Sequence, residues 1–378
     1  MAIRSIIKRL TRGAGGGDYR VGRLINSRRR EPQAPVAGQR HIVCDIDKTY
    51  LETEFESLVR MARIAFEAAA DKVTVTGASD VLMASRWGDV SAPLPPGSAA
   101  GAWPRPLHFV SSSPPQLRAV LEEKLMLDGL DWSSDTFKDQ AYNIRMRRMD
   151  LLRQHVAYKS LAILRLVMAA GAGTRFCMIG DNAESDAFVY VGIKLLLDGQ
   201  LDPAGYGAYL EAAGVEAGVA LDLLREVEIP DGAAVDVILI RNVPGYNFVR
   251  MEPLTDPVQT FDNFYQAALL LIAHGVIAPG VLFDLTRKFH NRHGMARHYL
   301  KAALTPLLAG DGPLRELAGA ARDTLERLGF SPELGAGSGA WSLRPRDLGE
   351  LAALKPARIV ELARLWQTKL RPAPTTSP

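Results

Sequence analysis

The chain has 378 residues, of which 47% are hydrophobic and 23% charged, and its formal net charge is +3. This length allows two or three domains with a large core, and the small net charge does not favour a nucleic-acid-binding protein. The two cysteines, Cys44 and Cys177, each lie in an apolar run. This predicts buried, reduced thiols in a cytoplasmic protein rather than a disulfide or a zinc site.

Residues 1–39 are predicted to be a basic, flexible N-terminal segment. Residues 1–40 contain ten Lys and Arg but only two acidic residues, and Ile and Leu recur at helical spacing over residues 3–10. Two alternatives remain open: a short helix on the surface of an anionic membrane, or a frayed tail without function. The expected location is cytoplasmic, and in the first case peripheral at the membrane surface.

The first chemically informative stretch is the apolar run Ile42–Cys44, followed by Asp45 and Asp47. Such a run is typical of a buried strand in a parallel sheet. In an extended backbone both carboxylates project to the same side and repel each other, unless a cation or a shared proton intervenes. This suits a Mg²⁺ site in which one carboxylate is a nucleophile and the other an acid/base. The alternative is a simple turn after the strand.

A second strand, Leu107–Val110, leads into three serines. Before it, residues 51–71 predict a helix with one apolar stripe, and residues 88–106 a long loop rich in Pro, Gly and Ser. Ser113 is expected to cap the next helix, with a proline at the first position and a glutamine closing a capping box. Ser111, at the strand end, has no such structural explanation.

Residues 131–150 are predicted to be charged and irregular, and a helix follows over residues 156–170. Lys159 lies in the first turn of that helix, where a cation opposes the helix dipole, so it fits a role other than helix stability. A third apolar strand, Arg175–Ile179, leads into the segment Gly180–Asp186. The acidic residues of this segment are Asp181, Glu184 and Asp186.

Apolar strands that alternate with helices, including a fourth strand over Val235–Ile240, predict an α/β fold with an open parallel sheet. Ligands of such sheets bind at the carboxyl ends of the strands. Five polar residues follow strand runs and are therefore expected to form one site: Asp45, Asp47, Ser111, Asp181 and Asp186.

Residues 251–370 are predicted to be a mainly helical C-terminal region, and residues 371–378 a disordered tail. Within this region, residues 264–283 lack charge. Gly275 and a later Pro-Gly pair interrupt them, which favours a helix and a turn over a membrane span.

Taken together, these segments resemble the haloacid dehalogenase (HAD) superfamily of phosphotransferases. Its four motifs are similar to Asp45–Thr49, Ser111, Lys159 and Gly180–Asp186, in this order. Within the superfamily, the catalytic domain of the actin-patch type of phosphatidate phosphatase is the most similar. The residues that carry this likeness are Phe109–Pro114 with Leu117, Lys159, and Ile179–Asp186 with Tyr190.

The resemblance implies a HAD-like catalytic domain over residues 40–250, with helices on both faces of the sheet and small cap or insert segments. It implies that Asp45 attacks phosphorus and forms an aspartyl-phosphate, and that Asp47 protonates the leaving alcohol and then activates water. Thr49 and Ser111 hydrogen-bond in the site, Ser111 holding the phosphoryl group, and Lys159 balances negative charge.

The implied metal is Mg²⁺, with ligands from Asp45, the main-chain carbonyl of Asp47, and Asp181. Asp186 is a ligand or the neighbour of one. The implied substrate is a phosphomonoester, and phosphatidate is the one that the resemblance favours. Two alternatives remain open: a soluble-metabolite phosphatase of the same fold, and a non-catalytic phosphatidate-binding module.

Overall fold

The structure is a computed structural model in which most of the chain can be described. The described residues are 25–30, 38–52, 72–87, 104–139, 155–308, 315–329 and 348–370. Most of the helix expected over 51–71 and of the loop expected over 88–106 lie outside these residues, as do residues 1–24 and the tail 371–378.

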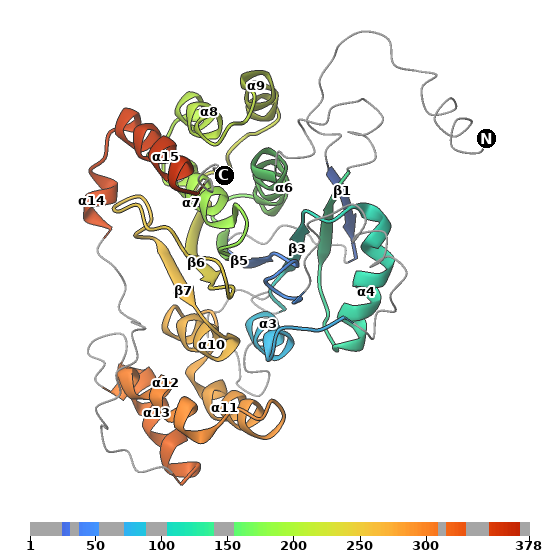
Figure 1. Cartoon of the computed structure of the whole chain (residues 1–378), viewed down its shortest axis with the longest axis vertical. Coiled ribbons are helices and arrows are strands. Elements are labelled where there is room, and N and C mark those ends of the chain that lie inside the picture. The colour runs from blue at the N-terminus through green and yellow to red at the C-terminus, as the bar shows by residue number, and fades with distance from the viewer. Residues whose placement is uncertain are drawn as a thin grey trace, which may run out of the picture.

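Seven strands of the described chain form one sheet, in the order β1-β4-β3-β2-β5-β6-β7 (Figure 1). Neighbouring strands are parallel, apart from β1, which runs antiparallel to β4. The strands are β1 (Ile25–Arg29), β2 (Arg40–Cys44), β3 (Leu107–Ser111), β4 (Ser134–Lys138), β5 (Arg175–Asp181), β6 (Ala234–Arg241) and β7 (Val258–Phe261). This is the predicted α/β fold.

Side chains of the central strands alternate between two hydrophobic cores, one on each face of the sheet. Ile42 and Cys44 of β2 belong to one core, and Val43 between them belongs to the other. Successive side chains of a strand point to opposite faces, so both faces of β2 need a helical cover. Figure 1 shows helices on the two sides of the sheet.

Two groups of helices supply this cover. On the face of Ile42 lie α3 (Ala78–Trp87), α4 (Arg118–Leu127), α10 (Phe264–Ala273), α11 (Leu282–Asn291), α12 (Arg297–Leu308) and α13 (Arg315–Arg327). On the face of Val43 lie α6 (His155–Ala170), α7 (Asp186–Leu197), α8 (Pro203–Ala212), α9 (Ala217–Arg225), α14 (Gly349–Ala352) and α15 (Pro356–Leu370). No helix of the described residues is long and apolar enough to span a membrane.

The structure differs from the sequence prediction in three parts of the chain. Ile25–Arg29, inside the segment expected to be flexible, forms the edge strand β1. Ser134–Lys138, expected to be irregular, forms β4, whose polar side chains are buried. The sheet also continues past residue 250, because β7 pairs with β6, and α15 packs against α8.

Candidate active site

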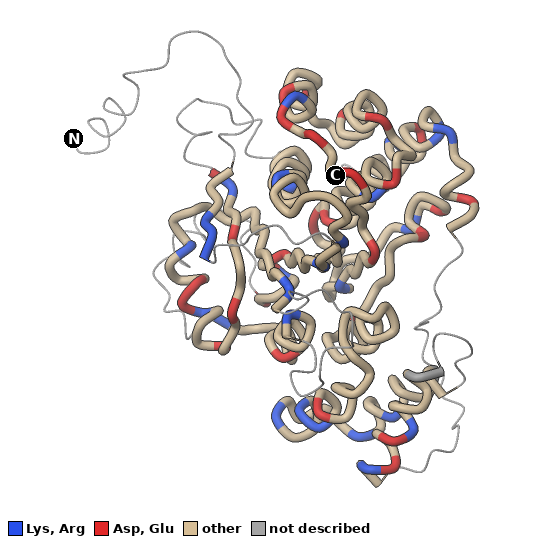
Figure 2. Tube along the Cα trace, turned by 180° about the vertical axis from the view of Figure 1, so that it is seen from behind, with Lys and Arg blue, Asp and Glu red and all other residues tan. Residues whose placement is uncertain are grey.

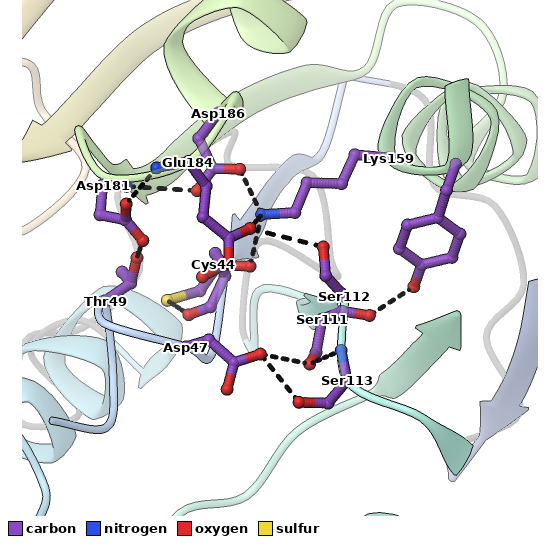
Figure 3. A network of polar contacts seen from close by, with 12 residues as sticks. Cys44, Asp47, Thr49, Ser111, Ser112, Ser113, Lys159, Asp181, Glu184 and Asp186 are labelled. Carbon is purple, nitrogen blue, oxygen red and sulfur yellow. Dashed lines mark hydrogen bonds and ion pairs between the residues drawn. The ribbon is translucent and has the colours of Figure 1, made fainter. Parts of the chain in front are cut away.

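The carboxyl ends of β2, β3 and β5 bring the predicted site residues together (Figure 3). Asp45 directly follows β2, Ser111 ends β3 and Asp181 ends β5. The Asp45 main-chain N–H donates to the carbonyl of Ile179 at 2.9 Å. The strand order reverses between β2 and β5, which is where open α/β sheets bind ligands.

Asp45, Asp181 and Asp186 form a buried cluster in which one oxygen of each carboxylate lies within 4.8 Å of the others. Burial raises the pKa of Asp181 to about 8, and the neighbouring carboxylates Asp186 and Glu184 add to this shift. A Cβ at Gly180 would lie 2.4 Å from Oδ2 of Asp186. Glycine at this position therefore allows Asp186 to approach the end of β5.

This cluster fits a divalent cation. Oδ2 of Asp45 is buried without a hydrogen-bond partner among the described residues, and a buried carboxylate oxygen without a partner is costly. Mg²⁺ and Ca²⁺ prefer carboxylate oxygens as ligands. Among the described residues, Asp45, Asp181 and Asp186 are thus side chains that can hold such a metal.

Lys159 lies between the carboxylates. Its Nζ is 2.8 Å from Oδ1 of Asp45, 2.5 Å from Oδ1 of Asp186 and 3.0 Å from Oε2 of Glu184. Although burial opposes its charge, the carboxylates, with Asp186 first, raise the pKa of Lys159 well above its usual value. The preceding Tyr158 fixes α6 on the sheet, since its hydroxyl oxygen lies 2.8 Å from each of two carbonyl oxygens, those of Ser111 and Thr136, and its one proton is available to either.

Asp47 points to a different set of partners. Its Oδ2 accepts hydrogen bonds from Oγ of Ser111 at 3.0 Å and from Oγ of Ser113 at 2.9 Å, while Oδ1 has no partner among the described residues. Burial, followed by repulsion from Glu184, raises the pKa of Asp47 to about 7, although both serines oppose the shift. Its carboxylate lies outside the three-Asp cluster, and the metal contact expected of its carbonyl stays a prediction.

Thr49 and Lys48 lie in the turn after Asp47. Oγ1 of Thr49 donates to Oδ2 of Asp181 at 3.2 Å. Lys48 adopts a left-handed φ of 59°, which is uncommon for a residue other than glycine. Its carbonyl accepts from Nη1 of Arg241 at 2.5 Å, and its Nζ donates to the hydroxyl of Tyr246 at 3.2 Å. These contacts hold the turn in place beside the site.

Two residues near the site were not among the predicted site residues. Ser113 was expected to cap a helix, but Pro114 precedes the short 3₁₀ helix Pro115–Leu117 without any side-chain cap. Glu184 forms an ion pair with Lys159, and its Oε2 also accepts a hydrogen bond from Oγ of Ser112 at 3.4 Å. The only sequence signal for either residue was its place within the serine run or the acidic segment.

A comparison with protein families agrees with this geometry. The family model described as the catalytic domain of phosphatidate phosphatase APP1 matches residues 40–202, from β2 to just before α8. Comparisons with curated proteins and with solved structures gave no match. The matched segment contains Asp45, Lys159 and Asp186, and it confirms the predicted resemblance. Residues 40–202 are thus similar to the catalytic domain of phosphatidate phosphatase APP1, and this likeness indicates a phosphoric monoester hydrolase.

Proposed function

We propose that this protein is a Mg²⁺-dependent phosphatidate phosphatase of the HAD type, which works through a phosphorylated Asp45. The observation that carries the proposal is the separation of the two carboxylates after β2. Asp45 lies against Lys159 and in the acidic cluster, whereas Asp47 lies against Ser111 and Ser113. This difference in surroundings supports a nucleophilic role for Asp45 and a proton-transfer role for Asp47.

In the first half-reaction, Asp45 attacks phosphorus and the bond between phosphorus and the alcohol oxygen breaks. Lys159 contacts Oδ1 of Asp45 and so orients the carboxylate for this attack. Asp47 gives its proton to the leaving alkoxide. A pKa raised to about 7 suits this exchange near neutral pH.

In the second half-reaction, the ionised Asp47 takes a proton from water, and the water oxygen attacks phosphorus. The bond between Asp45 and phosphorus breaks, inorganic phosphate leaves, and both carboxylates return to their starting states. Lys159 offsets the negative charge of Asp45 and the phosphoryl group, and Ser111 donates to a phosphoryl oxygen. Thr49 holds Asp181 in position.

Mg²⁺ is the metal that we propose for Asp45, Asp181, Asp186 and the Asp47 carbonyl. When bound, it neutralises charge on the phosphoryl oxygens and offsets the repulsion between the carboxylates. A thermal-shift measurement tests this independently of catalysis. The unfolding temperature should rise with Mg²⁺ in the wild-type protein and should not respond in Asp181→Ala.

The experiment that tests the function measures phosphate release from phosphatidate vesicles and from a small aryl phosphate, each with Mg²⁺ and with EDTA. We expect release from both substrates, loss with EDTA and recovery with Mg²⁺. Release from the aryl phosphate alone would favour a soluble-metabolite phosphatase. Release from neither would favour a phosphatidate-binding module and contradict the proposal.

We further propose a cytoplasmic location, peripheral at an anionic membrane. Support comes from the two free, buried cysteines and from the basic composition of residues 1–24, which have six Lys and Arg against one Asp. Basic residues beside an anionic surface each contribute about 1 kcal/mol to binding at low salt.

A further inference from the structure

Residues 282–301, from the start of α11 into α12, form a basic stretch outside the matched family segment. They contain five Lys and Arg against one acidic residue, Asp284, so their net charge is +4. The five are Arg287, Lys288, Arg292, Arg297 and Lys301. The whole chain carries only +3, and residues 1–24 carry +5, so the rest of the chain carries −6. The excess of positive charge is therefore confined to these two parts of the sequence.

Most of the basic side chains of this stretch lie on the surface. The side chains of Lys288 and Arg292 are 51% and 65% exposed, and both lie near Asp80 of α3, at 3.1 Å and 3.6 Å. Arg287 is 57% exposed and pairs with Asp284 at 3.1 Å. Figure 2 shows basic positions on α11 and just after it. Five basic residues against these two carboxylates leave an excess of three positive charges on this surface.

Two exposed rings follow the basic residues in the chain. Tyr299 is 64% exposed, and its ring lies 4.3 Å from that of His298, which is also exposed. A tyrosine ring has an apolar body and a polar tip, and it is suited to the boundary between water and the interior of a membrane. Basic residues beside an exposed aromatic ring are typical of segments that lie on an anionic membrane.

The end of α11 lies at the same edge of the sheet as the candidate site. Tyr50 directly follows the turn of the site, and its carbonyl accepts from the main-chain N–H of Val75 at 2.8 Å. α3 begins three residues after Val75, so its first turn lies beside that turn. Asp80 belongs to this first turn and pairs with Lys288 and Arg292 at the end of α11. The basic surface is therefore next to the carboxyl ends of the strands, where ligands of such sheets bind.

We propose that this surface binds an anionic membrane and holds the edge of the sheet that carries the candidate site against the phospholipid headgroups. The inference rests on the proposed function, in which the substrate is an anionic membrane lipid. An anionic membrane repels the net-negative remainder of the chain and attracts this surface, so the distribution of charge orients the molecule. The residues of the surface, named the α11–α12 surface, are Arg287, Lys288, Arg292, Arg297, His298 and Tyr299.

The test measures binding of the full-length protein to vesicles of phosphatidylcholine, with and without phosphatidylserine. Arg292→Gln/Arg297→Gln should weaken binding to the phosphatidylserine vesicles about tenfold at low salt, and high salt should remove the difference from the wild type. The matched control is Arg225→Gln/Arg358→Gln, which removes the same charge from side chains that are 68% and 50% exposed. These two residues belong to α9 and α15, on the other face of the sheet, and the control should bind as the wild type does.

Tyr299→Ser tests the aromatic contact. It should weaken vesicle binding several-fold at low and at high salt, because salt does not screen an apolar contact. Both variants of the α11–α12 surface should hydrolyse vesicle-borne phosphatidate more slowly and should keep the wild-type kcat/KM on a soluble aryl phosphate.

Equal vesicle binding by Arg292→Gln/Arg297→Gln and by the control pair would overturn the assignment of this surface. Tighter binding of the wild type to duplex DNA than to phosphatidylserine vesicles would also overturn it, and would point to a nucleic-acid partner. Vesicle binding does not require turnover. A wild-type protein that binds vesicles through this surface but hydrolyses neither substrate would therefore overturn the proposed function alone.

Discussion

Asp45 and Asp47 are two residues apart, yet their carboxylates meet different partners. Asp45 contacts a lysine and other carboxylates, whereas Asp47 contacts two hydroxyl groups. Different surroundings let two carboxylates take the separate roles of nucleophile and acid/base. Mutation of each residue should therefore have a different kinetic effect.

Asp47→Asn should slow reactions according to their leaving group. Asparagine keeps the shape of the side chain but cannot transfer a proton. We expect a loss of about 10²–10⁴-fold in kcat/KM for a glycerol-type alcohol and a much smaller loss for nitrophenol, which leaves without protonation. The measurement is kcat/KM on the two substrates, because it reports the first half-reaction and not the second, which both substrates share. Equal losses would mean that Asp47 does not act as the acid.

Gly180→Ala should displace Asp186 from its place at the end of β5. The new Cβ would lie 2.4 Å from Oδ2 and 2.6 Å from Cβ of Asp186, so the Asp186 side chain must leave its present position in the acidic cluster. We expect kcat to fall at least tenfold and the Mg²⁺ requirement to rise, both read from Mg²⁺ titrations of activity. Gly218→Ala is the control, because nothing lies within 4 Å of its Cβ, and it should behave as the wild type.

At the scale of helices and strands, the sequence predicted the elements that carry continuous apolar runs. β2, β3, β5 and β6 are such runs, and their buried positions require apolar residues on both faces. β1 and β4 were missed because their sequences are mainly polar. In β4, the buried carboxylate of Asp135 forms an ion pair with Arg118 at 2.7 Å. The spacing of apolar residues in the sequence cannot predict such a pair.

One carboxylate of α3 is paired with basic residues in and just after α11. Asp80 of α3 lies 3.1 Å from Nζ of Lys288 and 2.8 Å from Nε2 of His293, and basic and acidic residues both occur on α11 (Figure 2). Although burial opposes its charge, the hydrogen bonds from His293 and Lys288 hold the pKa of Asp80 below its usual value. The ionised form therefore stabilises the folded protein.

Asp80→Asn should lower the unfolding temperature at pH 7 by about 1–2 °C, the shift that a loss near 1 kcal/mol produces in a protein of this size. The folded-state pKa is the lower one, so the contribution is present above the unfolded pKa of about 3.9 and is lost as pH falls through the folded value. Thermal unfolding from pH 7 to pH 3 measures this. A difference between the two proteins that grows on acidification would contradict it.

At the scale of the whole molecule, the sequence predicted helices after residue 250 but not where they pack. An apolar stripe shows that a helix has a buried face, but it does not identify the helix or strand against which that face packs. The return of α15 to α8 and to Phe188 of α7 depends on contacts far apart in the chain. For the same reason the sequence did not predict Ser113 as a site residue, because its hydrogen-bond partner Asp47 lies 66 residues away.

The basic N-terminal segment can be tested by deletion of residues 1–24, which leaves β1 intact. This removes five net positive charges, six basic minus one acidic. Binding to anionic vesicles at low salt and hydrolysis of vesicle-borne phosphatidate should weaken, since salt-screened attraction is lost. Hydrolysis of an aryl phosphate should be unaltered. A tail without function predicts no change in either assay, and unaltered vesicle binding would exclude the docking role.

The central claim is that Asp45 carries the phosphoryl group during turnover. The direct measurement is the amount of ³²P bound covalently to the protein when the reaction with labelled phosphatidate and Mg²⁺ is stopped with acid. We predict label on the wild-type protein and none on Asp45→Asn. With a labelled aryl phosphate, whose leaving group needs no protonation, Asp47→Asn should carry more label than the wild type, because its second half-reaction lacks the base. Phosphate release by the wild type without any labelled protein, or label on Asp45→Asn equal to that on the wild type, would contradict the account.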